Sequence, residues 1–163
     1  RAVPEGYPED QMEAITLLTG KTKVNIDDLK VMVLLENAGE HFYLAAAKAV
    51  DNEQASALLA RNGQEERGHA HRLLKAIELL GGEPYPMPDD VDNPYIQPMD
   101  LTGMVNADLM VAIEQAEKDG DLSYQGWADT IGNPEVAKIF RQNGEEESRH
   151  GVRVTEVAKL LAG

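Results

Sequence analysis

The apolar positions along the chain predict four long helices. Apolar and small residues recur at the 3.6-residue period of a helix, whereas no stretch alternates between apolar and polar residues for long enough to indicate a strand. Glycine and proline punctuate the pattern, with Gly81 and Gly82 closing the second helix and Pro134 opening the fourth. The predicted helices span residues 27–50, 53–80, 101–131 and 134–161, and Asp100 is the predicted cap of the third.

The connections between these helices predict the topology. Short turns follow the first and third helices, but residues 83–100 contain five prolines and cannot be helical. These eighteen residues can reach about 60 Å when extended, enough to run the length of a bundle. We therefore predict an all-α four-helix bundle with one long crossover between the second and third helices, with two separate helical hairpins as the alternative. Residues 27–163 form this bundle, and residues 1–26 form an N-terminal extension with a short helix near residues 9–18.

The second half of the chain repeats the first. When the sequence is shifted by 81 residues, residues 61–82 match residues 142–163 at nine of 22 positions, whereas chance would give about one or two. We therefore expect two copies of a helical hairpin related by a pseudo-two-fold axis. A shared core explains apolar identities, but repeated polar residues need another reason. The repeated polar residues, with the glycines beside them, are Glu36/Glu117, Gly39/Gly120, Tyr43/Tyr124, Asn62/Asn143, Gly63/Gly144, Glu65/Glu146, Glu66/Glu147, His69/His150 and Arg72/Arg153.

Each copy contains a Glu-x-x-His motif. Residues three apart point to the same side of a helix, and both motifs lie in apolar stripes, which face a core. Counted from the turns, Glu36 and Glu117 lie at about the height of the motif in the partner helix, and Glu114 lies one turn earlier on the same face. We predict that five carboxylates and two imidazoles meet in the middle of the bundle: Glu36, Glu66, His69, Glu114, Glu117, Glu147 and His150.

Such a cluster requires cations. Bare carboxylates would repel one another, and each would lose several kcal/mol of hydration on burial. Two divalent ions supply a charge of +4 against the −5 of the five glutamates, and mixed oxygen and imidazole ligands suit iron or manganese better than zinc. The same ligand pattern is described for di-iron and di-manganese bundles. We therefore predict a site for two iron ions, with manganese or zinc as alternatives.

Residues around the cluster give weaker signals. Tyr43 and Tyr124 each follow a predicted ligand, Glu36 and Glu117, by seven residues. That position suits hydrogen bonds to the ligand carboxylates, and it suits ordinary core tyrosines equally well. Three further glutamates are expected to be solvated: Glu65, Glu145 and Glu146.

Composition narrows the function. The chain has 15 Lys and Arg against 29 Asp and Glu, a net charge of −14, so binding to nucleic acid or to an anionic membrane is not expected. The absence of cysteine excludes disulfides, thiolate sites and iron–sulfur clusters in this sequence. We find no transmembrane run and no signal-peptide pattern, and we expect a cytoplasmic protein. The sequence begins with arginine, which is consistent with removal of an N-terminal piece.

Residues 27–163 resemble the rubrerythrin-like branch of the ferritin-like superfamily. The resemblance rests on Glu36, on the two Glu-x-x-His motifs and on the pair Glu114-x-x-Glu117. It implies a ferritin-like bundle in which Glu66 and Glu147 bridge two irons. Glu36 and Glu114 would be terminal ligands, and His150 would hold the second iron. By the same resemblance Glu117 and His69 would be the catalytic pair, between which one iron moves as its redox state changes.

The resemblance also implies a reaction. A rubrerythrin-like protein would reduce hydrogen peroxide to water. Because rubrerythrins proper carry a rubredoxin-like four-cysteine iron domain and this sequence has no cysteine, the electrons are expected from a separate donor protein. A homodimer is expected by the same analogy. The alternatives are a dioxygen-using ferroxidase or oxygenase, a non-enzymatic iron-binding or storage protein, and a bundle whose acidic cluster is structural.

Overall fold

The computed structural model describes residues 2–163, and its regular secondary structure is helical. This part of the chain contains five α-helices and no strand, which confirms the predicted all-α class. No helix within it is both long and apolar enough to cross a membrane. The elements are α1 (Gln11–Thr19), α2 (Ile26–Ala49), α3 (Glu53–Leu79), a short 3-10 turn η1 (Asp90–Asp92), α4 (Ala107–Thr130) and α5 (Pro134–Ala162).

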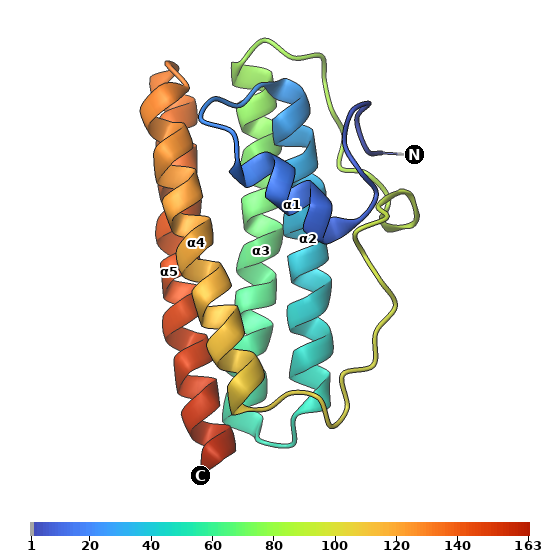
Figure 1. Cartoon of the computed structure of the whole chain (residues 1–163), viewed down its shortest axis with the longest axis vertical. Helices are drawn as coiled ribbons and strands as arrows, with labels where there is room; N and C mark the ends of the chain where they lie inside the picture. The colour runs from blue at the N-terminus through green and yellow to red at the C-terminus, as the bar shows by residue number, and fades with distance from the viewer. Residues whose placement is uncertain (1) are drawn as a thin grey trace.

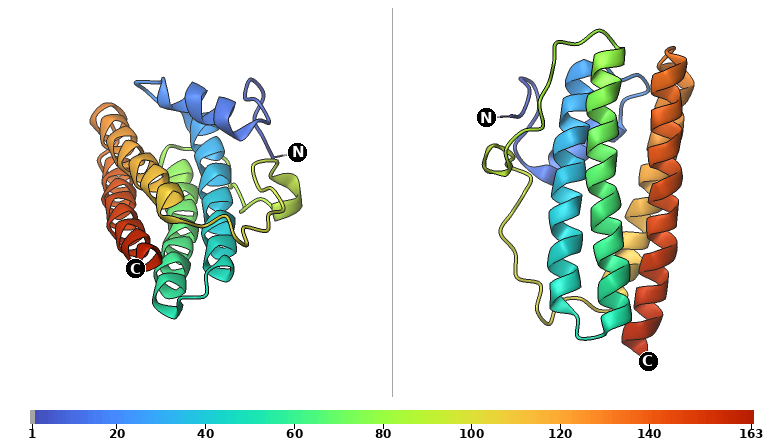
Figure 2. Two further views of the ribbon diagram at one scale, coloured as in Figure 1. Left: turned by 60° about the horizontal axis from the view of Figure 1, so that its bottom comes forward. Right: turned by 180° about the vertical axis from the view of Figure 1, so that it is seen from behind.

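The four long helices form two antiparallel hairpins, α2 with α3 and α4 with α5. The hairpins pack against each other mainly through α3 and α5, whereas α2 and α4 make few close contacts across the bundle. The crossover runs along the outside of α2 and joins the end of α3 to the start of α4 (Figures 1 and 2). The structure is therefore the predicted ferritin-like bundle, closed tightly on its α3/α5 side and more loosely between α2 and α4.

Asparagine side chains begin all four long helices. In each case the side-chain oxygen accepts a hydrogen bond from a backbone N–H of the first turn, which satisfies a donor that the helix leaves unpaired. At α2 the cap is reciprocal, because the Asp28 carboxylate also accepts from the backbone N–H of Asn25 at 2.8 Å. The caps are Asn25, Asn52, Asn106 and Asn133.

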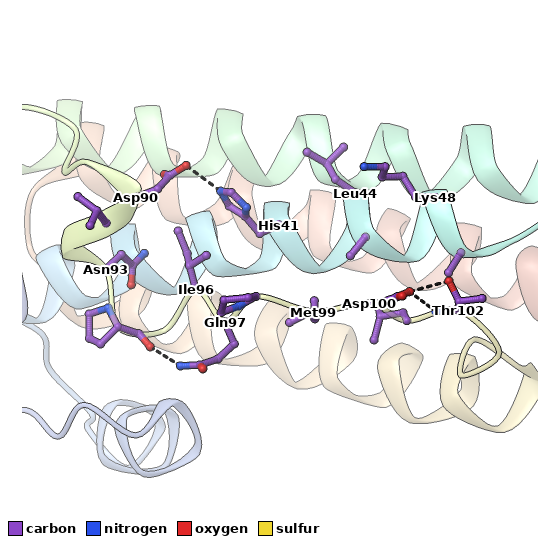
Figure 3. Close-up of a pocket in the computed structure, with 16 residues that line it drawn as sticks. His41, Leu44, Lys48, Asp90, Asn93, Ile96, Gln97, Met99, Asp100 and Thr102 are labelled. Carbon is purple, nitrogen blue, oxygen red and sulfur yellow. Dashed lines mark hydrogen bonds and ion pairs between the residues drawn. The ribbon is translucent and has the colours of Figure 1, made fainter.

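The predicted cap of the third helix is wrong. Asp100 lies in the crossover, where Oδ1 accepts hydrogen bonds from the backbone N–H and the hydroxyl of Thr102 at 3.0 and 2.6 Å (Figure 3). It stabilises a turn in place of a helix. The helix begins only at Ala107, where Asn106 accepts from the backbone N–H of Leu109 at 2.9 Å. The crossover is correspondingly longer than predicted.

The N-terminal segment ties the two hairpins together at one end of the bundle. α1, predicted near residues 9–18, lies across the outside of α2 (Figure 1). After it, the backbone carbonyl of Lys21 accepts a hydrogen bond from Trp127 Nε1 of α4 at 2.9 Å. Lys21 Nζ lies 2.8 Å from Asp28 of α2, which also accepts from the Tyr7 hydroxyl at 2.5 Å. The segment therefore bridges α2 and α4, which otherwise make little contact.

The apolar core is divided into two clusters along the bundle. On α3 one cluster contains Leu73 and Ile77 and the other contains Leu59, while Glu66 and His69 lie between them in the chain. The α5 helix repeats this arrangement, with Phe140 in the first cluster and Val157 in the second. A buried polar layer therefore crosses the middle of the bundle, where the sequence predicts the metal ligands.

Replacing Asp28 with Asn should destabilise the protein. The substitution removes the negative charge that pairs with Lys21 and replaces one of the two buried carboxylate oxygens with an NH2 group, which cannot accept a hydrogen bond. We expect the free energy of unfolding to fall by about 1–3 kcal/mol at pH 7. Burial opposes ionisation, but hydrogen bonds from Lys21 and Tyr7 lower the pKa of Asp28 below its usual value. The carboxylate therefore stabilises the fold above its unfolded-state pKa, and the difference between the two proteins should shrink as pH falls below about 4.

Urea denaturation of the metal-free proteins at several pH values measures this difference. Asp27→Asn, an exposed position in the same helical turn, is the matched control and should change stability by about 0.5 kcal/mol or less. Equal effects of the two substitutions would contradict the role assigned to Asp28.

Candidate metal centre

Each of the four long helices contributes one buried glutamate to the centre of the bundle. These are Glu36 from α2, Glu66 from α3, Glu117 from α4 and Glu147 from α5, each no more than 8% exposed. The carboxylates form two donor sets, in each of which the ligand atoms lie within 4.8 Å of one another. Both sets contain Glu66 and Glu147. The first set is completed by Glu36 and His69, and the second by Glu117 and His150.

The two histidines present the same nitrogen to the carboxylates. His69 Nδ1 lies 3.1 Å from Glu36 and 3.5 Å from Glu147, and His150 Nδ1 lies 2.9 Å from Glu66 and 3.5 Å from Glu117. The rings are fully buried and stacked, with centroids 5.3 Å apart. Two imidazole nitrogens therefore face two adjoining groups of oxygens, as two neighbouring metal ions would require.

A glutamate–arginine pair holds the other nitrogen of each histidine. His69 Nε2 donates to Glu146 at 3.1 Å, and both Glu146 oxygens accept from the Arg72 guanidinium at 3.0 Å. In the other half His150 Nε2 donates to Glu65 at 3.2 Å, and Glu65 accepts from Arg153. A carboxylate on the outer nitrogen fixes the tautomer and the orientation of a ligand histidine.

The expectation that Glu65 and Glu146 are solvated is therefore wrong. Glu146 is buried, and its hydrogen bond with His69, assisted by Arg72, lowers its pKa to about 2. The sequence contained the signal, since the Glu65/Glu146 pair recurs in both halves together with the Arg72/Arg153 pair. Glu145, which has no glutamate at the corresponding position of the first half, is exposed as expected.

The two tyrosines cross between the halves of the repeat. The Tyr43 hydroxyl of α2 donates to Glu117 of α4 at 2.6 Å, and the Tyr124 hydroxyl of α4 donates to Glu36 of α2 at 2.8 Å. Burial, and then the neighbouring carboxylates, raise the pKa of both hydroxyls well above its usual value, so they stay protonated donors. Each outer carboxylate is thus positioned by a tyrosine of the opposite hairpin.

The structure does not bring Glu114 to the other ligands. Its carboxylate lies 2.8 Å from Lys118 Nζ and accepts a hydrogen bond from the Thr155 hydroxyl at 2.8 Å. These two contacts lower the pKa of Glu114, as expected for a solvated ionised group. Among the described residues, Glu117 is thus the α4 glutamate in the donor sets. His69 and Glu117 also belong to different sets, so the expected movement of one ion between them is not what this arrangement displays.

One glycine makes room for a shared carboxylate. A Cβ at Gly39 would lie 3.0 Å from Glu66 Oε2, tighter than nine in ten real Cβ contacts. At the equivalent Gly120 a Cβ would lie 3.7 Å from the carboxyl carbon of Glu147, an ordinary van der Waals distance. Close approach to a shared carboxylate therefore favours glycine at position 39 but does not require it at position 120.

The electrostatics of the centre indicate that positive charge is missing from it. Burial, with repulsion from Glu147 next, raises the pKa of Glu66 and of Glu117 well above the usual value. Burial opposes protonation of His69, but Glu36 and the neighbouring carboxylates raise the pKa of that imidazole to about 12, so the carboxylates favour a positive charge at this place. Among the described buried atoms, Glu117 Oε2 and His150 Nδ1 have no hydrogen-bond partner. Both belong to the second donor set, and the residues present fit two divalent metal ions.

Two donor sets that share a pair of carboxylates inside such a bundle define a di-metal carboxylate protein. The family comparison agrees, since the model of the Rubrerythrin family matches residues 28–158. The chain belongs to this di-iron family of the ferritin-like superfamily. Neither the comparison with curated proteins nor that with solved structures found a match.

The sharing of Glu66 and Glu147 predicts the metal stoichiometry of variants. We expect the wild-type chain to bind two divalent ions, Glu36→Gln to retain the ion of the second set, and Glu66→Gln to lose both, because Glu66, unlike Glu36, belongs to both sets. Metal analysis after loading with Fe²⁺ or Mn²⁺ and desalting measures this. A wild-type chain that holds a single ion would contradict the arrangement.

Removing the outer carboxylate of His69 should weaken metal binding without removing a ligand. We expect Glu146→Gln to lower the affinity for divalent metal by about 10–100-fold, because the imidazole loses the partner that orients it. Competition with a chelator measures the affinity. Glu145→Gln changes the neighbouring exposed carboxylate and is the matched control. Equal affinities of the two variants would show that Glu146 has no such role.

Proposed function

We propose that this protein is a di-iron peroxidase, which reduces hydrogen peroxide to water with electrons from an external donor protein. The observation that carries the proposal is the sharing of Glu66 and Glu147 by two adjoining donor sets. Shared ligands hold two ions side by side, and two ions that each change oxidation state by one match the two electrons that peroxide reduction requires. Membership of the Rubrerythrin family supports iron as the metal.

The residues of the chain have separable tasks in this reaction. Iron at the two donor sets would supply the two electrons that break the O–O bond. Glu66 and Glu147 would hold both ions, whereas Glu36 with His69 and Glu117 with His150 would each complete one set. The sequence analysis expected His69 and Glu117 to exchange one ion. Under this proposal each of them is instead a ligand of a different ion.

Proton supply is built into the same layer. The balanced reaction consumes two protons for each peroxide and releases two waters. The Tyr43 hydroxyl already donates to Glu117, and that of Tyr124 donates to Glu36, so a protonated group stands behind each outer carboxylate. In these hydrogen bonds the hydroxyl oxygen that carries the proton lies 2.6 and 2.8 Å from the carboxylate oxygen.

The electron donor and the assembly belong to the proposal as well. The sequence contains no cysteine for a rubredoxin-like centre, which supports a separate donor protein. We also propose a cytoplasmic homodimer, in keeping with the family resemblance. One observation favours a second candidate, a dioxygen-using oxygenase: an apolar cavity of about 500 Å³ reaches the carboxylates, and an oxygenase needs room for an organic substrate.

Rapid mixing of the anaerobic Fe²⁺-loaded protein separates the two candidates. We expect one equivalent of hydrogen peroxide to oxidise both irons at least about tenfold faster than air-saturated buffer does, a difference of about 1.4 kcal/mol in barrier. The ferric absorbance measures both rates. Glu147→Gln should lose the fast phase and Glu145→Gln should keep it. Faster oxidation by dioxygen than by peroxide would favour the oxygenase.

A further inference from the structure

An apolar cavity of about 500 Å³ lies on the open side of the metal centre, between α2 and α4. Its walls come from α1, α2 and α4, with Met99 of the crossover at its edge. All four ligand glutamates line it, whereas neither ligand histidine does. The cavity therefore reaches the centre from the carboxylate side, opposite the stacked imidazoles. We call it the α2/α4 cavity.

The walls of the α2/α4 cavity differ from its inner end. They are formed mainly by hydrocarbon side chains, among them Met32, Leu35, Phe42, Ile113 and Trp127. Polar groups gather where the ligand carboxylates and the two tyrosines meet. A cavity of this size with apolar walls and a few convergent polar groups is typical of a site for a small organic molecule.

Hydrogen peroxide alone does not account for such walls. It is a small polar molecule, and apolar side chains around it would supply no hydrogen bonds. The same walls would bind a hydrocarbon group favourably, because both surfaces leave water. The inner end of the cavity is polar, because the Glu117 carboxylate and the Tyr43 hydroxyl that donates to it both line it.

We propose that the α2/α4 cavity binds the hydrocarbon part of an organic hydroperoxide, ROOH, with its peroxide group at the carboxylate end. This inference rests on the proposed peroxidase function and names a substrate class for it. In the balanced reaction the O–O bond breaks, two electrons and two protons are taken up, and an alcohol ROH and one water leave. The two electrons come from the reduced metal pair, which the external donor restores.

A hollow of about 1050 Å³ beneath the crossover does not offer this access. It lies on the far side of α2 beneath the crossover, and the ion pair between His41 and Asp90, 3.0 Å long, spans it (Figure 3). Leu44 and Lys48 line its α2 wall. No metal ligand lines this groove, so a molecule bound there would be separated from the centre by α2.

Narrowing the cavity tests the proposal. Ala116 of α4 lines the cavity and is exposed at its edge, so Ala116→Phe places a ring across the space between α2 and α4. Ala112→Phe, one turn earlier at an exposed position that does not line the cavity, is the matched control. Ser123→Phe is a second blocking variant, because Ser123 lines the cavity further along α4.

The first readout is binding to zinc-substituted protein, which cannot reduce peroxides. The probe is 2-phenyl-2-propanol, the alcohol formed from cumene hydroperoxide. Trp127, the single tryptophan, lines the cavity, so its fluorescence should change on titration. We expect saturable binding to the wild type and to Ala112→Phe, and at least about tenfold weaker binding to the two blocking variants.

The second readout is the ratio of kcat/KM for cumene hydroperoxide to that for hydrogen peroxide in the iron-loaded protein. We expect the ratio to fall at least about tenfold in the blocking variants and to stay unchanged in Ala112→Phe.

A wild type that reduces hydrogen peroxide but does not bind the alcohol overturns the inference and leaves the peroxidase function intact. A protein that reduces neither peroxide refutes the function, while alcohol binding lost in the blocking variants would still support an apolar ligand. A dimer that Ala116→Phe dissociates, with no alcohol bound, would assign the cavity to a second copy of the chain and overturn the inference.

Discussion

Four carboxylates in the dry middle of a bundle are the constraint on which the rest of this structure depends. Glu36, Glu66, Glu117 and Glu147 lose most of their hydration, and their mutual repulsion has to be offset by positive charge in the same place. Two divalent ions would neutralise the four negative charges. Because Glu114 lies outside the centre, oxidation of both ions would leave two uncompensated positive charges. By charge alone, this centre stabilises the reduced pair more than a five-carboxylate centre would.

The internal repeat explains how the chain keeps such a layer in register. The hydrogen bonds that position the ligands run from one hairpin to the other: Tyr43 reaches Glu117, His69 reaches Glu146, and the Asn62 amide reaches the backbone carbonyl of His150 at 3.2 Å. The equivalent hydrogen bonds of the second half of the repeat run back to the first hairpin. Neither hairpin alone can complete a donor set, so association of the two hairpins and formation of the metal centre are one event. Metal binding should therefore be coupled to the stability of the whole bundle.

The sequence predicted the bundle and most of its centre, because helical periodicity indicates the helices and the 81-residue repeat indicates the ligands. Helical spacing located α2, α3 and α5 to within a few residues, and the repeat singled out Glu66, His69, Glu147 and His150. The prediction failed where local and tertiary contacts compete. Asp100 has the residue type of a cap but is engaged by Thr102, and Glu114 lies one turn away from Glu117, where Lys118 and Thr155 hold it outside. The sequence analysis predicted both glutamates as ligands, because helical spacing places them on one face; the 81-residue repeat pairs only Glu117 with Glu36, and Glu117 is the one in the donor sets.

Because the four helices pack unevenly, the two sides of the centre differ in how closely they are covered. Close packing of α3 against α5 brings the two Glu-x-x-His motifs together, and the Glu146–Arg72 and Glu65–Arg153 pairs close that side against solvent. The opposite side is formed by α2 and α4, which carry the outer carboxylates and are joined by the two tyrosine–glutamate hydrogen bonds and by the N-terminal segment. Under the proposed function, a reactant would approach between α2 and α4, past apolar walls, and meet the carboxylate side of the centre. The α3/α5 side would then orient the metal ligands and the α2/α4 side would select the reactant, so sequence changes in α1, α2 and α4 would alter that selection without disturbing the histidines.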